Sequence, residues 1–297
     1  MVSPVEAIDD PRLDGYRHLT DGALRRAYES EHGLFVLEGA RVVRRGVEAG
    51  WSVRSLLLVP AGLSALADVA RQVEARGGDV FVADRAVLGA IAGFAVHRGV
   101  LALAERRAER SAPALIGASR LVVVVEGVND HENLGSIFRN SAAFGAGAVL
   151  LDPRTCDPLY RRSVRVSMGH VLTLPFARLT PWPDSLSCLR DVGFAVVALD
   201  PASRRTVRDV AEQVGRLAGH PRLAVMVGAE GDGLTRGAIA AATFTAGIPM
   251  AGAVDSLNVA TSLAVALHSF SSIDDAPLRA FPVGPGAFPG GLEPRGD

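Results

Sequence analysis

Apolar runs alternate with amphipathic segments along residues 119–272. The runs read as strands and are "LVVVVEG", "AVLLDP", "FAVVALDP", "LAVMVGAEG" and "FTAGIPM". Helix-like segments lie near residues 134–144, 158–168, 184–192, 206–217 and 235–242, and a last helix is predicted in "SLNVATSLAVALHSF". Near-continuous apolar strands interleaved with helices favour a parallel sheet covered by helices on both faces.

A smaller α/β unit is predicted upstream, over residues 12–105. Its strands are "LFVLEG", "VRSLLLVP", "DVFVAD" and "GVLALAE", and its helices include "ARVVRRGVEAG" and "SALADVARQVEARGG". Residues 106–118 are charged, carry a proline and lack a clear period, so we expect a linker there. The proline- and glycine-rich composition of residues 273–297 predicts a disordered tail.

Every basic side chain of this protein other than histidine is an arginine. Lysine and arginine together number 31 and no lysine occurs, while the formal net charge is −1. A near-neutral chain has no global basic field, so a nucleic-acid site must be a local patch. Codon bias in a GC-rich genome explains the missing lysines, but each cation is still a planar guanidinium suited to phosphate.

Several classes of protein are disfavoured by the sequence. Two cysteines, Cys156 and Cys188, cannot form a disulfide framework, and a reducing cytoplasm suits them best. The seven histidines lack metal-ligand spacing, so no metal is expected. The first residues are not those of a signal peptide, and no apolar stretch is long enough to span a membrane.

Polar clusters follow the predicted strands, where loops of a parallel sheet bind ligands. The first cluster contains Asn133, Gly135 and Arg139. Asn133 can cap a helix, and Arg139, nearly two turns further on, is expected on roughly the same side. The alternative is a capped helix with one solvated arginine. The residues Asp130 to Glu132 just before it are expected to be solvated.

The second and third clusters are "LAVMVGAEGDGL" and "IPMAGAVDSLNVATSLAVALH". The glycines of the second permit close approach of backbone to a ligand, although their spacing is a poor match to a dinucleotide fingerprint. In the third, Ser256 or Asp255 is expected to cap the final helix. A tight strand-to-helix turn and a structural cap are the alternatives for these clusters.

Taken together, the three clusters resemble the motifs of one family, the SpoU (TrmH) RNA ribose 2′-O-methyltransferases of the SPOUT superfamily. The first motif, N-x-G-x-x-x-R followed by A-x-F-G, matches Asn133, Gly135, Arg139, Ala142 and Gly145. The second matches Gly228, Ala229, Glu230, Gly233 and Leu234. The third matches Ile248, Pro249, Met250, Ser256, Leu257, Asn258 and Val259. Asn140 and Ser141 depart from the Thr-Ala common in the family.

The resemblance implies an α/β protein whose parallel-sheet SPOUT domain, residues 119–272, contains a deep trefoil knot. It also implies a smaller RNA-binding domain before it, since "FVLEGARVV" and "VHRGVLAL" are similar to landmarks of that domain. Knots are rare exceptions to ordinary chain topology, and no periodicity predicts one. A cytoplasmic homodimer is the expected form.

The resemblance also implies roles for individual residues. S-adenosylmethionine would be held by Gly228, Ala229, Ile248, Pro249, Met250 and Leu257. Catalysis would fall to Arg139, Asn133, Glu230, Ser256 and Asn258. Because a guanidinium is a poor base, we expect Arg139 to grip a phosphate and stabilise the developing alkoxide, with the proton acceptor left open.

A basic patch for RNA is predicted in "DPLYRRSVRVSMGH", where Arg161 and Arg165 stand one helical turn apart beside Arg162, with His170 nearby. A solvated helix face is the alternative; Arg41, Arg44 and Arg45 are secondary candidates.

Ribosomal RNA is favoured over transfer RNA by analogy alone. A transfer-RNA methyltransferase and a non-catalytic RNA-binding protein of the same fold remain the alternatives. A Rossmann-type methyltransferase is disfavoured, because "EGVNDHENLG" lacks its glycine-rich loop.

Overall fold

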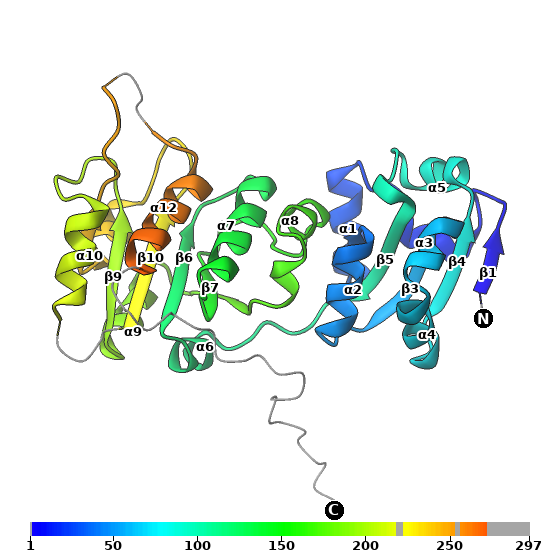
Figure 1. Ribbon diagram of the computed structural model, residues 1–297, viewed down its shortest axis with the longest axis horizontal. Coiled ribbons are helices and arrows are strands. Elements are labelled where there is room, and N and C mark those ends of the chain that lie inside the picture. The colour runs from blue at the N-terminus through cyan, green and yellow to red at the C-terminus, as the bar shows by residue number, and fades with distance from the viewer. Residues whose placement is uncertain (1, 218–221, 253–255, 272–297) are drawn as a thin grey trace, which may run out of the picture.

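The computed structural model of the chain describes residues 2–217, 222–252 and 256–271. These residues form two α/β units that lie side by side (Figure 1). The expected disordered tail, residues 273–297, lies outside the described residues.

The first unit is built on a five-stranded sheet of order β1-β4-β3-β5-β2, in which β5 is antiparallel to both neighbours. Its strands are β1 (Val2–Val5), β2 (Leu34–Glu38), β3 (Val53–Leu58), β4 (Asp79–Ala83) and β5 (Val100–Glu105). Its helices are η1 (Pro11–Tyr16), α1 (Gly22–His32), α2 (Ala40–Glu48), α3 (Pro60–Ala65), α4 (Ala67–Ala75), α5 (Arg85–Ala92) and η2 (His97–Gly99).

The second unit is built on a six-stranded sheet of order β11-β9-β10-β6-β7-β8, and every pair in it is parallel. Its strands are β6 (Leu121–Glu126), β7 (Ala148–Leu151), β8 (Phe176–Arg178), β9 (Phe194–Leu199), β10 (Arg222–Gly228) and β11 (Phe244–Ala246). Its helices are α6 (Ala112–Ala118), α7 (His131–Ala143), α8 (Arg161–Val166), η3 (His170–Leu172), η4 (Asp184–Leu186), α9 (Ser187–Asp191), α10 (Val207–Gly215), α11 (Arg236–Ala241) and α12 (Val259–Ser271).

Helices cover both faces of this parallel sheet, as predicted. Val123 and Val225 face one way, into a core that also takes buried residues of α7, α8, α10 and α12. Val122 and Ala224 face the other way, against α6, α9 and α11. The continuous apolar runs in the sequence follow from this burial on both sides.

Two boundaries differ from the expectation. Strand β1 pairs with β4, so the first sheet begins ten residues before the predicted start at residue 12. The second half of the expected linker is helix α6, whose Leu115 and Ile116 are buried against the second sheet. A seven-residue helix with two consecutive buried positions is too short to reveal a helical period in the sequence.

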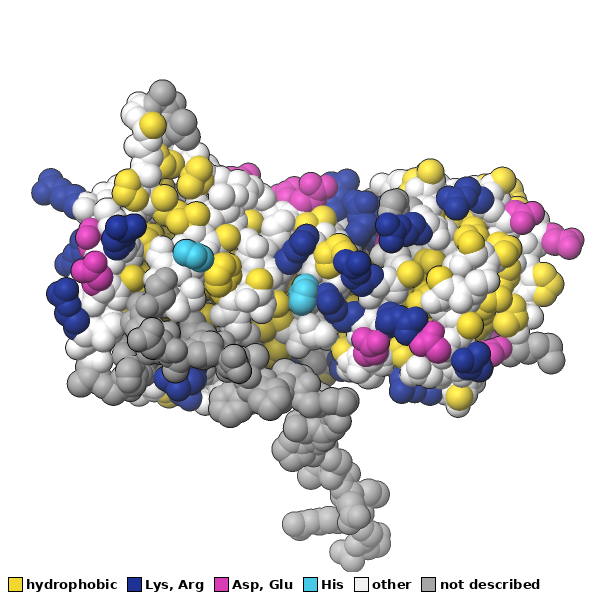
Figure 2. All heavy atoms as spheres, in the orientation of Figure 1, with side chains coloured by type: hydrophobic (Ala, Val, Ile, Leu, Met, Phe, Trp, Pro, Cys, Tyr) yellow, Lys and Arg dark blue, Asp and Glu magenta, His cyan; other side chains and the backbone are white. Residues whose placement is uncertain are grey.

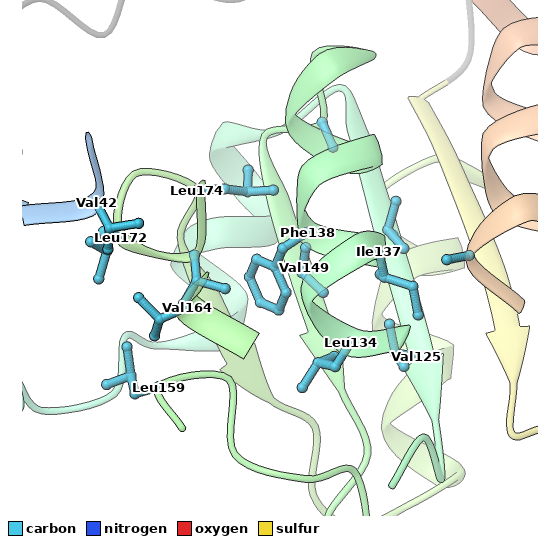
Figure 3. Packing of buried hydrophobic residues seen from close by; sticks show 14 of the residues in the cluster. Val42, Val125, Leu134, Ile137, Phe138, Val149, Leu159, Val164, Leu172 and Leu174 are labelled. Carbon is cyan, nitrogen blue, oxygen red and sulfur yellow. The ribbon is translucent and has the colours of Figure 1, made fainter. Parts of the chain in front are cut away.

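The two units share one continuous hydrophobic core. Val42 of α2 lies beside Leu172 of η3 in the close view (Figure 3). Polar contacts reinforce this junction: the indole Nε1 of Trp51 donates to the carbonyl of Leu172 at 2.9 Å, and Arg45 Nη1 donates to the carbonyl of Met168 at 2.5 Å. The first unit is therefore packed firmly on the second.

Arg161, predicted to bind RNA, is held in an ion pair in this structure. Its Nη1 lies 2.5 Å from Oε2 of Glu38, a carboxylate only 3% exposed, and its guanidinium lies over the ring of Phe94. Arg165 approaches the same carboxylate at 3.8 Å, and Arg162 lies 3.6 Å from Glu132. Arg161 joins the two units, whereas Arg162 and Arg165 remain predicted RNA contacts.

Candidate active site

Three loops of the second unit leave the carboxyl edge of the parallel sheet, two from the neighbouring strands β6 and β10 and one from β11, which β9 separates from β10. They run from β6 into α7, from β10 towards α11, and from β11 towards α12. The last of these projects from the sheet edge in the view of Figure 1. Each loop carries one of the three motifs found in the sequence.

Helix α7 is capped by Asp130, not by Asn133 as expected. The Asp130 Oδ1 accepts hydrogen bonds from the backbone N–H groups of Glu132 and Asn133, both at 2.8 Å. Asp130 is exposed, as expected, and also caps the helix. With the helix end satisfied, the side chain of Asn133 is available for contacts outside its own helix.

Helix α12 is capped by Asn258, so the expected cap at Ser256 is wrong; Asp255 lies outside the described residues. The Asn258 Oδ1 accepts from the N–H groups of Ala260 and Thr261, at 3.0 and 3.2 Å. Both bonds are of the kind that holds the first turn of a helix.

The amide nitrogen of the same Asn258 links all three motifs. It donates to Oδ1 of Asn133 at 2.6 Å and to Oε1 of Glu230 at 2.9 Å. Three of the predicted catalytic residues therefore meet in one hydrogen-bonded cluster, which we call the amide hub. Asn258 and Glu230 are exposed, so this hub faces solvent and an incoming ligand.

The loop after β10 folds tightly back on itself. The N–H of Gly233 donates to the carbonyl of Ala229 at 3.0 Å, and Gly231 and Gly233 have φ angles of 90° and 66°. A Cβ at Gly228 would lie 2.2 Å from the carbonyl carbon of Gly233. Gly228 is required because backbone approaches it too closely for a side chain, whereas Gly231 and Gly233 are favoured by their positive φ angles.

A buried carboxylate that the sequence analysis missed anchors this loop. Glu126 at the end of β6 is 1% exposed and accepts from Trp182 Nε1 at 2.6 Å. It also accepts from the N–H and the hydroxyl of Thr235, both at 2.8 Å, and Arg154 Nη2 lies 3.6 Å away. The sequence signal that could have revealed it is a charged residue, Glu126, at the end of the otherwise apolar run "LVVVVE".

We expect Glu126→Ala to lower the free energy of unfolding by at least about 2 kcal/mol, because it leaves the N–H of Thr235 and the indole N–H of Trp182 without an acceptor. Urea denaturation would measure the loss. Glu212→Ala is the control, since that carboxylate is 61% exposed in its ion pair with Arg216 and should change the free energy by less than about 1 kcal/mol. Equal effects for the two variants would contradict the anchoring role.

A second buried carboxylate shapes the turn between β6 and α7. Asp152 accepts from the N–H of Gly127 at 2.9 Å and from the N–H and hydroxyl of Thr155 at 2.8 and 2.6 Å. Burial works to raise the pKa of Asp152, but these hydrogen bonds outweigh it and lower the pKa. An ionised Asp152 therefore holds Gly127 in its left-handed turn.

Cys156 lies under the same turn, where its N–H donates to the carbonyl of Val128. Burial, reinforced by the charges of Asp157 and Asp130, raises the pKa of the Cys156 thiol to about 12. The thiol stays protonated at neutral pH, so it serves neither as nucleophile nor as proton acceptor.

Arg139 does not lie on the face of α7 that carries the hub. Asn133 reaches Asn258, and Asn140 Nδ2 donates to the carbonyl of Ala260 at 2.8 Å, so the side of α7 facing α12 bears residues seven positions apart. Arg139 is exposed and precedes Asn140 by one residue, which turns it about 100° around the helix axis from that side. Its charge contributes to lowering the pKa of His170. The expectation that it faces the same side as Asn133 is wrong, because six residues are about 1.7 turns.

The two residues that depart from the family pattern have clear structural roles. Asn140 ties α7 to α12 through the carbonyl of Ala260. Ser141 is fully buried and donates to the carbonyl of Ile137 at 2.7 Å. Both therefore support the helix pair whose ends carry the hub.

The predicted cofactor residues lie along the same edge of the sheet. Met226 of β10 and Thr245 of β11 both pair with Ala198 of β9, which lies between them. Gly228 and Gly247, each two residues further along its chain segment, therefore lie at the same edge of the sheet. Adjacent strands are about 4.8 Å apart, which places Ile248 roughly two strand spacings from Gly228.

These residues suit a ligand that is recognised by backbone groups. Ile248, Met250 and Leu257 are apolar and half-buried, whereas Pro249 is exposed. Within the described part of the chain, the backbone groups of Ile248, Pro249 and Met250 make no hydrogen bond with another segment. Half-buried carbonyl and N–H groups need partners, and an aromatic base ligand would supply them.

Two open clefts described by the structure lie elsewhere. The larger, of about 470 Å³, lies between α10 and α12 and is lined by Arg208, Glu212, Arg216 and His268, with three smaller residues. Neither cleft contains a predicted site residue. The convergence of the hydrogen bonds, not the size of a cavity, defines the site.

The described residues contain neither a candidate metal-ion cluster nor a helix that could span a membrane. Residues 2–217, 222–252 and 256–271 contain no group of three or more histidine, cysteine or acidic side chains placed to hold a metal ion. In the same ranges, no helix has both the length and the apolar character needed to cross a bilayer.

Comparison with known proteins shows the class of protein to which the chain belongs: it is an RNA methyltransferase. The model of the SpoU rRNA Methylase family matches residues 120–268, and the model of the MRM3-like substrate binding domain matches residues 24–102. The chain belongs to the SpoU rRNA methylase family, which confirms the resemblance found in the sequence.

Relatives and solved structures agree with this assignment. The chain is 40% identical to uncharacterized tRNA/rRNA methyltransferases of Mycobacterium tuberculosis and Mycobacterium bovis over 88% of each chain. It is 27% identical to an AdoMet-bound rRNA methyltransferase from Sinorhizobium meliloti, with a TM-score of 0.76 over 91% of this chain and 98% of that one. An RNA 2′-O ribose methyltransferase matches with 26% identity and a TM-score of 0.69 over the same shares.

Proposed function

We propose that this protein transfers a methyl group from S-adenosylmethionine to a ribose 2′-hydroxyl of RNA. The observation that carries the proposal is the amide hub, in which Asn258 holds Asn133 and Glu230 together from three separate loops. An RNA 2′-O ribose methyltransferase and an AdoMet-bound rRNA methyltransferase are among the similar structures, which supports both the reaction and the cofactor.

The hub suits the recognition of a sugar hydroxyl. Asn258 donates hydrogen bonds to the side-chain oxygen of Asn133 and to one carboxylate oxygen of Glu230. Within the described residues, the amide nitrogen of Asn133 and the second carboxylate oxygen of Glu230 have no partner and can bind a ligand. A hydroxyl both donates and accepts, so a neighbouring donor and acceptor can fix its direction.

The cofactor would be held by backbone groups near Gly228, Ala229, Ile248, Pro249, Met250 and Leu257, and it would supply an electrophilic methyl group on sulfur. The chain's own residues would orient the hydroxyl and accept or relay its proton. Glu230 is the carboxylate that the hub places for this, while Ser256, exposed two positions before Asn258, would close the site.

Arg139 is proposed to bind a phosphate of the substrate RNA. Because it is exposed and lies near enough to His170 for its charge to lower the pKa of that histidine, it would grip the backbone next to the target ribose rather than touch the hub. Two parallel N–H donors of a guanidinium match two phosphate oxygens, which a lysine ammonium cannot reproduce.

Arg139→Lys is expected to lower the rate of methyl transfer by about tenfold or more, because it removes the bidentate grip. Tritium transfer from labelled S-adenosylmethionine to deproteinised ribosomal RNA measures the rate, and calorimetry should find cofactor affinity unchanged. Arg85→Lys, at an exposed position on α5, is the control. A turnover near that of the unmodified protein would rule out a role specific to guanidinium.

The favoured substrate is ribosomal RNA, with transfer RNA as the alternative. The family description names rRNA, and the relatives' names include both RNAs. We also propose a cytoplasmic homodimer, since the outer side of α12 presents Thr261 and the 40%-exposed Val265 rather than charged side chains.

The proposed function is tested by mapping where label enters RNA taken from a strain that lacks this gene. Ribose methylation blocks alkaline cleavage of the following phosphodiester bond, so labelled, alkali-resistant dinucleotides from ribosomal RNA are expected. Label on a base would refute the 2′-hydroxyl assignment, and label in transfer RNA alone would select the alternative substrate. A protein that binds RNA but no S-adenosylmethionine would be a non-catalytic binder.

A further inference from the structure

Three arginines and a histidine gather where the two units meet. Arg41 and Arg45 come from α2 of the first unit, whereas Arg139 of α7 and His170 of η3 come from the second. We call them the junction surface. Arg41 and Arg139 are exposed, and Arg45 and His170 are half-exposed. Figure 2 shows dark blue side chains and a histidine gathered where the units meet.

The positive charge of the junction surface is not neutralised by ion pairs. Among the described residues, no carboxylate lies within ion-pair distance of Arg41, Arg45, Arg139 or His170. Neighbouring arginines differ in this respect, since Arg44, Arg161, Arg162 and Arg165 each have an acidic partner. The arginines without an acidic partner therefore lie beside the predicted patch, and Arg162 and Arg165 of that patch are paired but exposed.

Packing holds these cations close to one another. Arg45 Nη1 donates to the carbonyl of Met168 at 2.5 Å, which places its guanidinium beside the turn that precedes His170. Burial, then the charges of Arg45 and Arg139, lower the pKa of His170, and burial with the charge of Arg41 lowers the pKa of Arg45. Like charges held together repel, and a bound anion would relieve the repulsion.

The arrangement fits a polyanion better than a small anion. The four side chains belong to two units and three helical elements, so they extend along a surface instead of surrounding one point. Guanidinium groups spread in this way match successive phosphates of a nucleic-acid backbone. The Arg161–Glu38 ion pair and the Trp51 hydrogen bond fix the two units relative to one another, so the spacing of the cations is fixed too.

We propose that the junction surface binds the sugar-phosphate backbone of the RNA substrate as it crosses from the first unit to the second. This inference rests on the proposed function and adds the path of the strand. Arg41, a secondary candidate in the sequence, and His170, a neighbour of the predicted patch, are assigned to phosphate binding, and Arg139 stands at the end of the path nearest the target ribose. The first unit then acts by extending one continuous phosphate track rather than by a separate binding site.

The double variant Arg41→Ala, His170→Ala tests the proposal in the full-length protein. The probe is a fluorescein-labelled single-stranded RNA of about 20 uridines, and fluorescence polarisation measures its affinity over a range of NaCl concentrations. We expect the double variant to bind about five- to tenfold more weakly at low salt. The slope of log K against log salt should become shallower by about 0.7 for each phosphate that the variant no longer neutralises.

Arg85→Ala is the matched control, because it removes one exposed cation from α5 of the first unit, away from the junction (Figure 1). It should leave the affinity within about twofold of the unmodified protein if location matters beyond total charge. Thermal unfolding of each variant excludes loss of structure as the cause of weaker binding.

Unchanged RNA affinity of the double variant, or a decrease no greater than that of the control, would overturn the proposal. Loss of inorganic phosphate binding with unchanged RNA affinity would assign the surface to a small anion and overturn it as well. These outcomes differ from failure of the proposed function, which would appear as absent methyl transfer by the unmodified protein. The binding comparison remains decisive in either case.

Discussion

Replacing Gly228 by alanine is expected to abolish measurable binding of S-adenosylmethionine and to destabilise the protein by about 3 kcal/mol. The new Cβ would lie 2.2 Å from the carbonyl carbon of Gly233 and 2.4 Å from the backbone nitrogen of Leu234. Both atoms belong to backbone, so no side-chain rotation relieves the overlap. Calorimetry with the cofactor and urea denaturation measure the two effects.

The loop after β10 cannot simply shift to make room for that methyl group. It is held by the bond from Gly233 to Ala229 and, further on, by the bond from Thr235 to the buried Glu126. Gly117→Ala is the control, since nothing lies within 4 Å of a Cβ there and the residue is in helix α6. That variant should be as stable as the unmodified protein or slightly more stable. Near-normal cofactor binding by Gly228→Ala would contradict the role assigned to this turn.

Asn258→Asp is expected to reduce methyl transfer about 100-fold while leaving the fold nearly intact. Aspartate keeps an oxygen for the N–H groups of Ala260 and Thr261, so helix α12 stays capped. It has no N–H for Asn133 or Glu230, and its charge repels the carboxylate of Glu230. The hub should therefore open although the helix does not unravel.

Asn258→Ala separates the two functions of this residue. It should lose about as much activity as the aspartate variant and, in addition, about 1 kcal/mol of stability, because the cap is gone. Single-turnover methyl transfer and thermal unfolding of the two variants distinguish these effects. An aspartate variant that keeps a third or more of the normal rate would show that the hub's hydrogen bonds are dispensable for the reaction.

Much of the fold could be predicted because burial on both sides of a parallel strand leaves a direct mark on the sequence. The runs "LVVVV" and "LAVMV" are strands β6 and β10, which lie next to each other at the centre of the sheet. Strand β1 and helix α6 were missed for the opposite reason. Each is too short to show a period, and each is stabilised by the sheet it packs on rather than by its own residues.

The candidate site, too, could be predicted only in part from the sequence. The motifs identified Asn133, Glu230 and Asn258, and the structure brings these three together. The helix caps were misassigned, because Asp130 and Asn258 compete with several nearby residues that can also cap a helix. Local sequence alone does not decide which of them turns inward.

Long-range charge pairing was beyond the sequence analysis altogether. Arg161 looked like an RNA contact, but it pairs with Glu38, which is 123 residues away in the chain. Glu126 anchors Thr235 across 109 residues. Partners at such separations are set by how the two units and their loops pack, so the availability of each arginine to RNA depends on the tertiary structure.

The sequence by itself determined the alternation of strands and helices, the division into two units and the family, because hydrophobic period and motif spacing are local properties of the chain. Only the tertiary structure decided which polar groups meet: the amide hub, the anchoring of the β10 loop by Glu126, the direction of Arg139 and the neutralisation of the predicted patch. Hydrogen bonds and ion pairs act over a few ångströms, and residues come within that range only when distant segments pack together.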